Sequence, residues 1–278
     1  MRWRGRRQST NVEDRRGQRM MRGKRKASGG VMLVLILVGL FFGEDVQRAL
    51  SLVIDTNEQV QQVPTRSKSV NDQNVAFVKT ILAETEDTWS QIFAQSGSTY
   101  QAPVLVLYDG RTPTACGMGQ AASGPFYRPG DYKIYIDLSF MGELKRMGAP
   151  GDFAFAYVIA HEVGHHVQNI IGIAKDVRQK QSRSNKAVAN ALSVNMELQA
   201  DCLGGIWINH TEKRGAILER GDIEEGFAAA AVGDDTIMKR AGMAPRRENF
   251  THGSSRERMY WFKQGMESGS ISACQTFS

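Results

Sequence analysis

Residues 161 to 165, His-Glu-Val-Gly-His, constrain this chain more than any other feature. The two histidines are four positions apart. Four residues of an α-helix turn through about 400°, so both imidazoles would lie on one face, one turn apart. Apolar residues recur at helical spacing from 153 to 171, which predicts a helix over that range. We therefore expect a helix that directs two imidazoles to a common point.

Two imidazoles so placed suit Zn²⁺ and leave room for a third protein ligand and a water. We predict that His161 and His165 bind one Zn²⁺. Glu162 follows the first ligand and is expected to act as a general base. It would take a proton from the attacking water and later pass it to the leaving amine.

A second pair of residues with the same spacing is Glu197 and Asp201, on a helix predicted over residues 187 to 209. We assign Glu197 to the metal. Asp201 would then support the metal centre by accepting a hydrogen bond from the far nitrogen of a ligating histidine, which fixes its tautomer. Two alternatives stay open: Asp201 as the ligand, and a purely structural role for the Glu197 carboxylate.

Two further histidines need an interpretation. His252 precedes Gly253, Ser254 and Ser255, in a loop before a predicted helix, where its imidazole can donate a hydrogen bond to a developing oxyanion. An equally supported alternative is a helix cap built by one of the two serines, with the histidine merely nearby. His166 is turned about 100° from the metal face and is expected to be structural.

Three segments together resemble one known family. They are HEVGHHVQ at 161–168, ELQADCLGG at 197–205 and FTHGSSRER at 250–258. These segments are similar to the bacterial putative neutral zinc metallopeptidases. The resemblance covers roughly residues 70–278, including DIEEGFAAAAVGDD at 222–235, and does not extend to the N-terminal arm. It implies a zincin-like fold, one Zn²⁺ with a glutamate as third ligand, peptide-bond hydrolysis and a single-pass membrane location.

Positive charge is concentrated at the start of the chain. Residues 1–28 hold 11 of the 35 Lys and Arg residues and two of the 29 acidic residues, so the remainder has 24 basic against 27 acidic residues. A protein that binds nucleic acid should carry its basic surface on the folded part, so we expect no nucleic-acid partner. Residues 1–28 contain few large apolar residues and are predicted to be a disordered cytoplasmic arm.

Residues 29–43, GGVMLVLILVGLFFG, contain no charge and are followed by Glu44 and Asp45. The preceding basic residues favour the cytoplasm for that side. The run is shorter than the roughly 20 residues that a spanning helix needs. We favour an uncleaved single-pass transmembrane helix, with a cleaved signal peptide and a buried core helix as alternatives. Either of the first two would place the following domain on the extracytoplasmic side.

The remaining chain divides into a polar linker, residues 44–74, and a zinc metallopeptidase domain, residues 75–278. Within the domain we predict strands over 103–108 and 132–138 and further helices over 75–93, 223–232 and 256–266. This order predicts an α+β fold, with a small antiparallel sheet followed by several helices. We expect an extended substrate to add to the edge of the strand at 132–138.

The three cysteines are Cys116, Cys202 and Cys274. Cys202 follows Asp201 and is expected to pack as a small apolar residue. We expect Cys116 and Cys274 to form a disulfide in an oxidising compartment.

The expected function is that of a zinc-dependent metallopeptidase acting on a peptide or protein substrate. One alternative is an exported, non-catalytic binding module that keeps a structural zinc. Another is a zinc hydrolase that acts on a non-peptide amide or ester. Glu162 favours catalysis, because a structural zinc site has no need of a carboxylate beside the metal.

Overall fold

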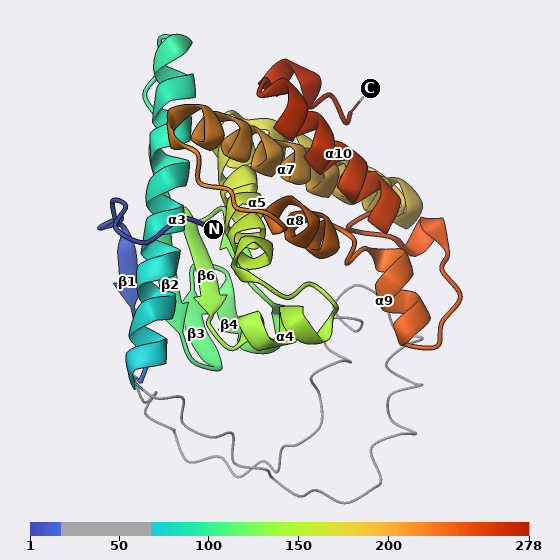
Figure 1. The fold of residues 1–278 in the computed structure, drawn as a ribbon. Helices are drawn as coiled ribbons and strands as arrows, with labels where there is room; N and C mark the ends of the chain where they lie inside the picture. Colours follow the sequence, from blue (N-terminus) through green and yellow to red (C-terminus); the bar gives the residue numbers. More distant parts are fainter. Residues whose placement is uncertain (18–67, 278) are drawn as a thin grey trace, which may run out of the picture.

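The computed structural model describes residues 1–17 and 68–277, and its fold is α+β (Figure 1). One sheet has the strand order β1-β2-β6-β5, and β3 and β4 form a separate two-stranded sheet. The strands are β1 (Val12–Asp14), β2 (Val104–Tyr108), β3 (Arg111–Thr114), β4 (Gly117–Gln120), β5 (Phe126–Arg128) and β6 (Lys133–Asp137). The two strands expected from the sequence are confirmed as β2 and β6.

The helices include all those expected from periodicity, together with three short ones that were not predicted, α4, α6 and α9. They are α3 (Lys68–Gln95), α4 (Phe140–Arg146), α5 (Asp152–Ile170), α6 (Ile173–Gln181), α7 (Lys186–Gly215), α8 (Asp222–Ala230), α9 (Asp234–Arg240) and α10 (Ser255–Ser268). Helix α3 begins at Lys68, so residues 68–74 belong to this helix and not to the predicted linker. Figure 1 shows α5 in the middle of the molecule, with α7 and α10 side by side.

The main sheet corrects the prediction of an antiparallel arrangement. Strand β2 pairs in parallel with both β1 and β6, and only β5 runs antiparallel to β6. Parallel neighbours need a long connection, and residues 109–132, which include the β3–β4 hairpin, provide one. Since β6 is paired on both sides, the expectation that a substrate adds to its edge is wrong.

Helix α5 carries the His-Glu-Val-Gly-His motif through the core. Apolar side chains on it are fully buried, among them Phe153, Ile159, Val163 and Val167. Burial on nearly all sides explains why the helix is apolar well beyond a single stripe. The motif is therefore held by a helix with little freedom to move.

Glycines allow the helices around the site to approach closely. A Cβ on Gly164 would lie 2.9 Å from the carbonyl oxygen of Ala200, so α5 and α7 meet at the two motifs. On the other face of α7, a Cβ on Gly265 of α10 would lie 1.8 Å from the carbonyl oxygen of Cys202. Small residues at both crossings fix α7 between α5 and α10.

The N-terminal segment is folded, and the prediction of a disordered arm is wrong for residues 1–17. Strand β1 adds to the edge of β2, and Trp3 is 9% exposed and packs edge-to-face on Phe77, with ring centroids 5.3 Å apart. Two of its arginines pair with carboxylates of α3: Arg6 with Glu84 at 2.9 Å and Arg7 with Asp87 at 2.7 Å. Charge alone therefore does not keep this segment unfolded, because its partners lie on the domain.

The packing of the segment also bears on membrane topology. A single crossing between the arm and the domain would separate residues 1–17 from α3 and β2 by a bilayer, whereas the structure places them in direct contact. The predicted cytoplasmic arm and extracytoplasmic domain are thus in conflict with the fold. Within the described residues no helix has the length and apolar character to cross a membrane. The predicted anchor, residues 29–43, lies outside the described residues.

Replacing Trp3 with alanine should lower the free energy of unfolding by about 3 kcal/mol, the range found when a large buried aromatic side chain is truncated. Chemical denaturation measures this, with Gln8→Ala as the matched control, because Gln8 is exposed in the same segment. We expect the control to stay within about 0.5 kcal/mol of the wild type. Equal stability of Trp3→Ala and the wild type would mean that the segment is not part of the core.

The cysteine pairing also differs from the prediction. Cys274 is bonded to Cys202, with the Cα atoms 5.7 Å apart, and Cys116 is free and exposed. Cys202 is fully buried on the side of α7 that faces α10 and the C-terminal tail, so a neighbouring thiol is within reach. The tail is thus linked to the helix that carries Glu197 and Asp201.

Candidate metal centre

The close crossing of α5 and α7 brings three predicted ligands together. His161 Nε2 lies 3.1 Å from Glu197 Oε2, and His165 Nε2 lies 3.4 Å from Glu197 Oε1. One potential ligand atom from each residue falls within 4.8 Å of the others. Glu197, and not Asp201, is therefore the carboxylate that lies next to both Nε2 atoms.

The far nitrogen of each imidazole is held by a hydrogen-bond acceptor. His161 Nδ1 lies 2.7 Å from Asp201 Oδ1, and His165 Nδ1 lies 2.9 Å from Gln168 Oε1. A carboxylate only accepts hydrogen bonds, so the Nδ1 of His161 carries a hydrogen, and Nε2 is the nitrogen that a metal would bind in place of a proton. For His165, Gln168 directs its amide oxygen at Nδ1, because its amide nitrogen donates to the carbonyl oxygen of Met196. The Nδ1 of His165 therefore carries a hydrogen as well.

These residues fit Zn²⁺. Two Nε2 atoms and one carboxylate converge on a shared point, and three N/O ligands are typical of a catalytic zinc. The charge around the site also favours a bound cation. Although burial favours the neutral ring, Asp201 and Glu197 raise the pKa of His161 to about 10. That negative charge favours a cation beside Nε2.

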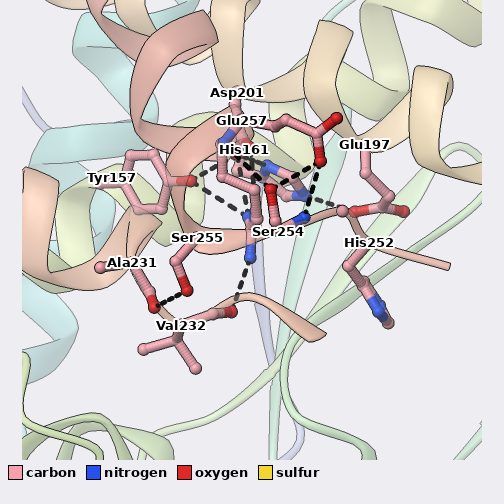
Figure 2. A network of polar contacts seen from close by, with 12 residues as sticks. Tyr157, His161, Glu197, Asp201, Ala231, Val232, His252, Ser254, Ser255 and Glu257 are labelled. Atoms are coloured by element: carbon pink, nitrogen blue, oxygen red, sulfur yellow. Dashed lines mark hydrogen bonds and ion pairs between the residues drawn. The ribbon is translucent and has the colours of Figure 1, made fainter. Parts of the chain in front are cut away.

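Asp201 is held in turn by residues that the sequence analysis did not identify. Its carboxylate is fully buried and accepts two hydrogen bonds of 2.9 Å from the Arg258 guanidinium. The Tyr157 hydroxyl donates a further hydrogen bond to it, and Figure 2 shows Tyr157, His161 and Asp201 joined in one network. Arg258 lies in the FTHGSSRER segment, which was the available signal for it.

Glu162 is buried beside this centre, with 7% of the residue exposed. Burial raises the pKa of its carboxyl group above the usual value of a glutamate, against the charges of His165 and His161. The backbone of Tyr127 in β5 also acts to lower this pKa, but less than burial raises it. A carboxyl group with a raised pKa, held next to a metal, is suited to accept and return a proton.

His252 is fixed by Asp234 at the start of α9. Its Nδ1 lies 3.2 Å from Asp234 Oδ1, and Asp234 Oδ2 also accepts the backbone N–H of His252 at 2.7 Å. The helix cap considered as the alternative is present as well: Ser254 and Glu257 form a capping box at the start of α10. The cap is thus built by Ser254, while His252 has its own carboxylate partner.

Figure 2 shows His252 next to Glu197, one of the candidate metal ligands. Its charge is one of several that hold the pKa of Glu197 well below the usual range, although burial acts in the opposite direction. The side chain of His252 is 32% exposed. It is therefore within electrostatic range of the metal ligands and accessible from solvent.

His166 lies apart from the metal ligands, as expected. Its Nε2 is 2.6 Å from the carbonyl oxygen of Gln101, and its Nδ1 is 3.1 Å from the Tyr127 hydroxyl. Burial lowers the pKa of His166 to about 4, so the ring is neutral. It joins α5 to the loop before β2.

A cavity of about 260 Å³ opens beside the ligands. His165 and Glu197 form part of its wall, and much of the remainder is apolar, including Tyr127, Val177 and Met196. The cavity is therefore a space next to the ligands that an apolar group can enter.

Comparisons with known proteins agree with this site. A family described as "Putative neutral zinc metallopeptidase" matches residues 1–277. The match includes the N-terminal segment, which corrects the expectation that the arm lies outside the family resemblance.

Two relatives illustrate the range of similarity. The chain is 47% identical over 292 residues to the "Uncharacterized protein YpfJ" of Escherichia coli (strain K12), covering 100% of this chain and 99% of the relative. It is 37% identical over 191 residues to the "Uncharacterized protein Rv2575" of Mycobacterium tuberculosis (strain ATCC 25618 / H37Rv), covering 64% of each. No solved structure shows significant similarity to the chain. The chain belongs to the family of putative neutral zinc metallopeptidases.

Proposed function

We propose that this protein is a zinc-dependent peptidase with a zincin-like active site. The observation that carries the proposal is the convergence of His161, His165 and Glu197 next to a buried Glu162. Zinc held there would polarise the scissile carbonyl and make a water more acidic. The family description supports zinc and peptide hydrolysis as the chemistry.

The residues around that centre would have separate roles. Glu162 accepts the proton of the attacking water and returns it to the leaving amine. Asp201, held by Arg258, keeps the Nδ1 hydrogen of His161 in place so that Nε2 stays directed to the metal. The apolar cavity beside His165 receives a side chain of the substrate and excludes water from it.

The geometry favours catalysis over a structural zinc. In the described part of the chain the ligand group has three members, whereas structural zinc sites usually have four protein ligands. The cavity gives access to two of the ligands.

The Cys202–Cys274 disulfide is in keeping with an oxidising compartment outside the cytoplasm.

Digestion of a mixed peptide library tests this function. The zinc-loaded protein should cleave peptides, a chelator should stop cleavage, and added zinc should restore it. Mass spectrometry identifies the products. Cleavage of ester or non-peptide amide substrates alone would favour the second type of hydrolase, and zinc binding with no hydrolysis of any substrate would favour a binding module.

His252 is the residue we assign to the oxyanion. Replacing it with alanine should lower kcat by about 10² to 10³, the usual effect of removing one such donor, with KM changed much less. Asp234→Asn should lower kcat to a smaller extent, because the ring stays in place but loses its ionic partner. Steady-state kinetics on one library peptide measures both variants. An unchanged kcat for His252→Ala would leave the histidine with a structural role.

A further inference from the structure

The C-terminal tail packs onto α7 close to the metal centre. Cys274 is fully buried and bonded to Cys202, which follows Asp201 in the helix. The Thr276 hydroxyl donates a hydrogen bond of 2.7 Å to the carbonyl oxygen of Asn195. The tail is therefore held at two points on the helix that supplies Glu197.

A chain of hydrogen bonds runs from this tail to a metal ligand. The carbonyl oxygen of Cys274 accepts a hydrogen bond of 3.0 Å from Gln199 Nε2. Gln199 Oε1 accepts one of 3.0 Å from Gln168 Nε2, and Gln168 Oε1 lies 2.9 Å from His165 Nδ1. Gln168 is fully buried and Gln199 is 6% exposed, so water competes little for these bonds.

The donor and acceptor roles in these hydrogen bonds are set at the C-terminal tail. A backbone carbonyl only accepts hydrogen bonds, so it selects the amide nitrogen of Gln199 and turns the Gln199 oxygen toward Gln168. Gln168 then uses its nitrogen on Gln199 and on the carbonyl oxygen of Met196, which leaves its oxygen for His165. Each amide orientation follows from the one before it.

We propose that the disulfide-anchored C-terminal tail positions the ligand His165 through Gln199 and Gln168, so that zinc affinity depends on residues that do not touch the metal. Asp201 does the same for His161 by a single carboxylate contact. His165 has no such carboxylate at its Nδ1 among the described residues and relies on the amide pair. The inference rests on zinc binding at the proposed site and not on peptide hydrolysis.

Zinc affinity, measured by competition with a chromophoric chelator, tests the proposal. The proteins compared are the full-length wild type, Gln168→Met, Gln199→Met and the double variant. Gln179→Met is the matched control, because Gln179 is an exposed glutamine on α6 outside the hydrogen bonds that lead to His165. The visible absorption of cobalt(II) in each protein is a second readout, since it reports ligand geometry at the metal.

We expect Gln168→Met to bind zinc about 10- to 100-fold more weakly, the range seen when a partner of a metal ligand is removed. Gln199→Met should bind zinc about tenfold more weakly and shift the cobalt spectrum, and Gln179→Met should match the wild type. The double variant should be no weaker than Gln168→Met, because both residues act through one chain. Replacing both Cys202 and Cys274 with serine should also weaken zinc binding.

Wild-type affinity and an unchanged cobalt spectrum in Gln199→Met would overturn the proposal. Losses that multiply in the double variant would overturn it too, because Gln199 would then act independently of Gln168. Unchanged zinc affinity in the double serine variant would show that the tail does not contribute to the hydrogen bonds that position His165. If Gln168→Met does not fold, Gln199→Met decides alone. Since the readout is metal binding, a failure of peptide cleavage would contradict the proposed function without altering this result.

Discussion

Replacing Glu162 with glutamine should reduce peptide cleavage by at least about 10³-fold while zinc still binds with wild-type stoichiometry. The amide keeps the size of the side chain but cannot accept a proton, and general acid–base catalysis contributes typically about 10² to 10⁴. The effect should be at the upper part of this range, because we assign both proton transfers to this one carboxylate. Glu162 is buried beside the two histidines, and its pKa is raised above the usual value of a glutamate, which suits it to both transfers.

The measurement is kcat/KM on one library peptide together with zinc content by mass spectrometry. Glu224→Gln is the matched control, because Glu224 is an exposed glutamate on α8, away from the ligands. The control should cleave at the wild-type rate. A Glu162→Gln protein that retains zinc and cleaves within tenfold of the wild type would show that another group is the base.

Replacing Arg258 with methionine should lower the free energy of unfolding by about 3 to 5 kcal/mol. The guanidinium makes two hydrogen bonds to the fully buried carboxylate of Asp201, and removal of one partner leaves a buried charge uncompensated. The desolvation cost of Asp201 would remain, while its main attraction would be gone. Zinc affinity should fall as well, since Asp201 orients His161.

Chemical denaturation of the metal-free proteins measures the loss of stability. Arg256→Met is the matched control on the same helix, because Arg256 is exposed. Adding Asp201→Asn to Arg258→Met should recover part of the lost stability, because the unpaired charge is then removed. A change below about 1 kcal/mol in Arg258→Met would contradict the structural role assigned to the pair.

The clustering of the candidate ligands was largely predictable because helical spacing is a local property. His161, Glu162 and His165 lie within five residues of one helix, and Glu197 was recognised from the same four-residue spacing. What the spacing did not reveal is how the two helices meet. Gly164 permits that contact with Ala200, and its role appears only once the helices are packed.

The features that were wrong or missed depend on contacts between distant residues. Strand β1 pairs with β2 although more than 80 residues separate them in the chain, and Arg6 finds its carboxylate partner 78 residues away. Cys202 and Cys274 are 72 residues apart. Composition described the N-terminal segment as too polar to fold by itself, which does not exclude folding against a surface of opposite charge.

The most direct test of the metal centre is a crystal structure of the zinc-loaded protein with anomalous data at the zinc absorption edge. We predict one anomalous peak between His161 Nε2, His165 Nε2 and the carboxylate of Glu197, with three protein ligands and one side open toward the cavity. No peak at this position, or a zinc closed by four protein ligands, would contradict a catalytic zinc centre.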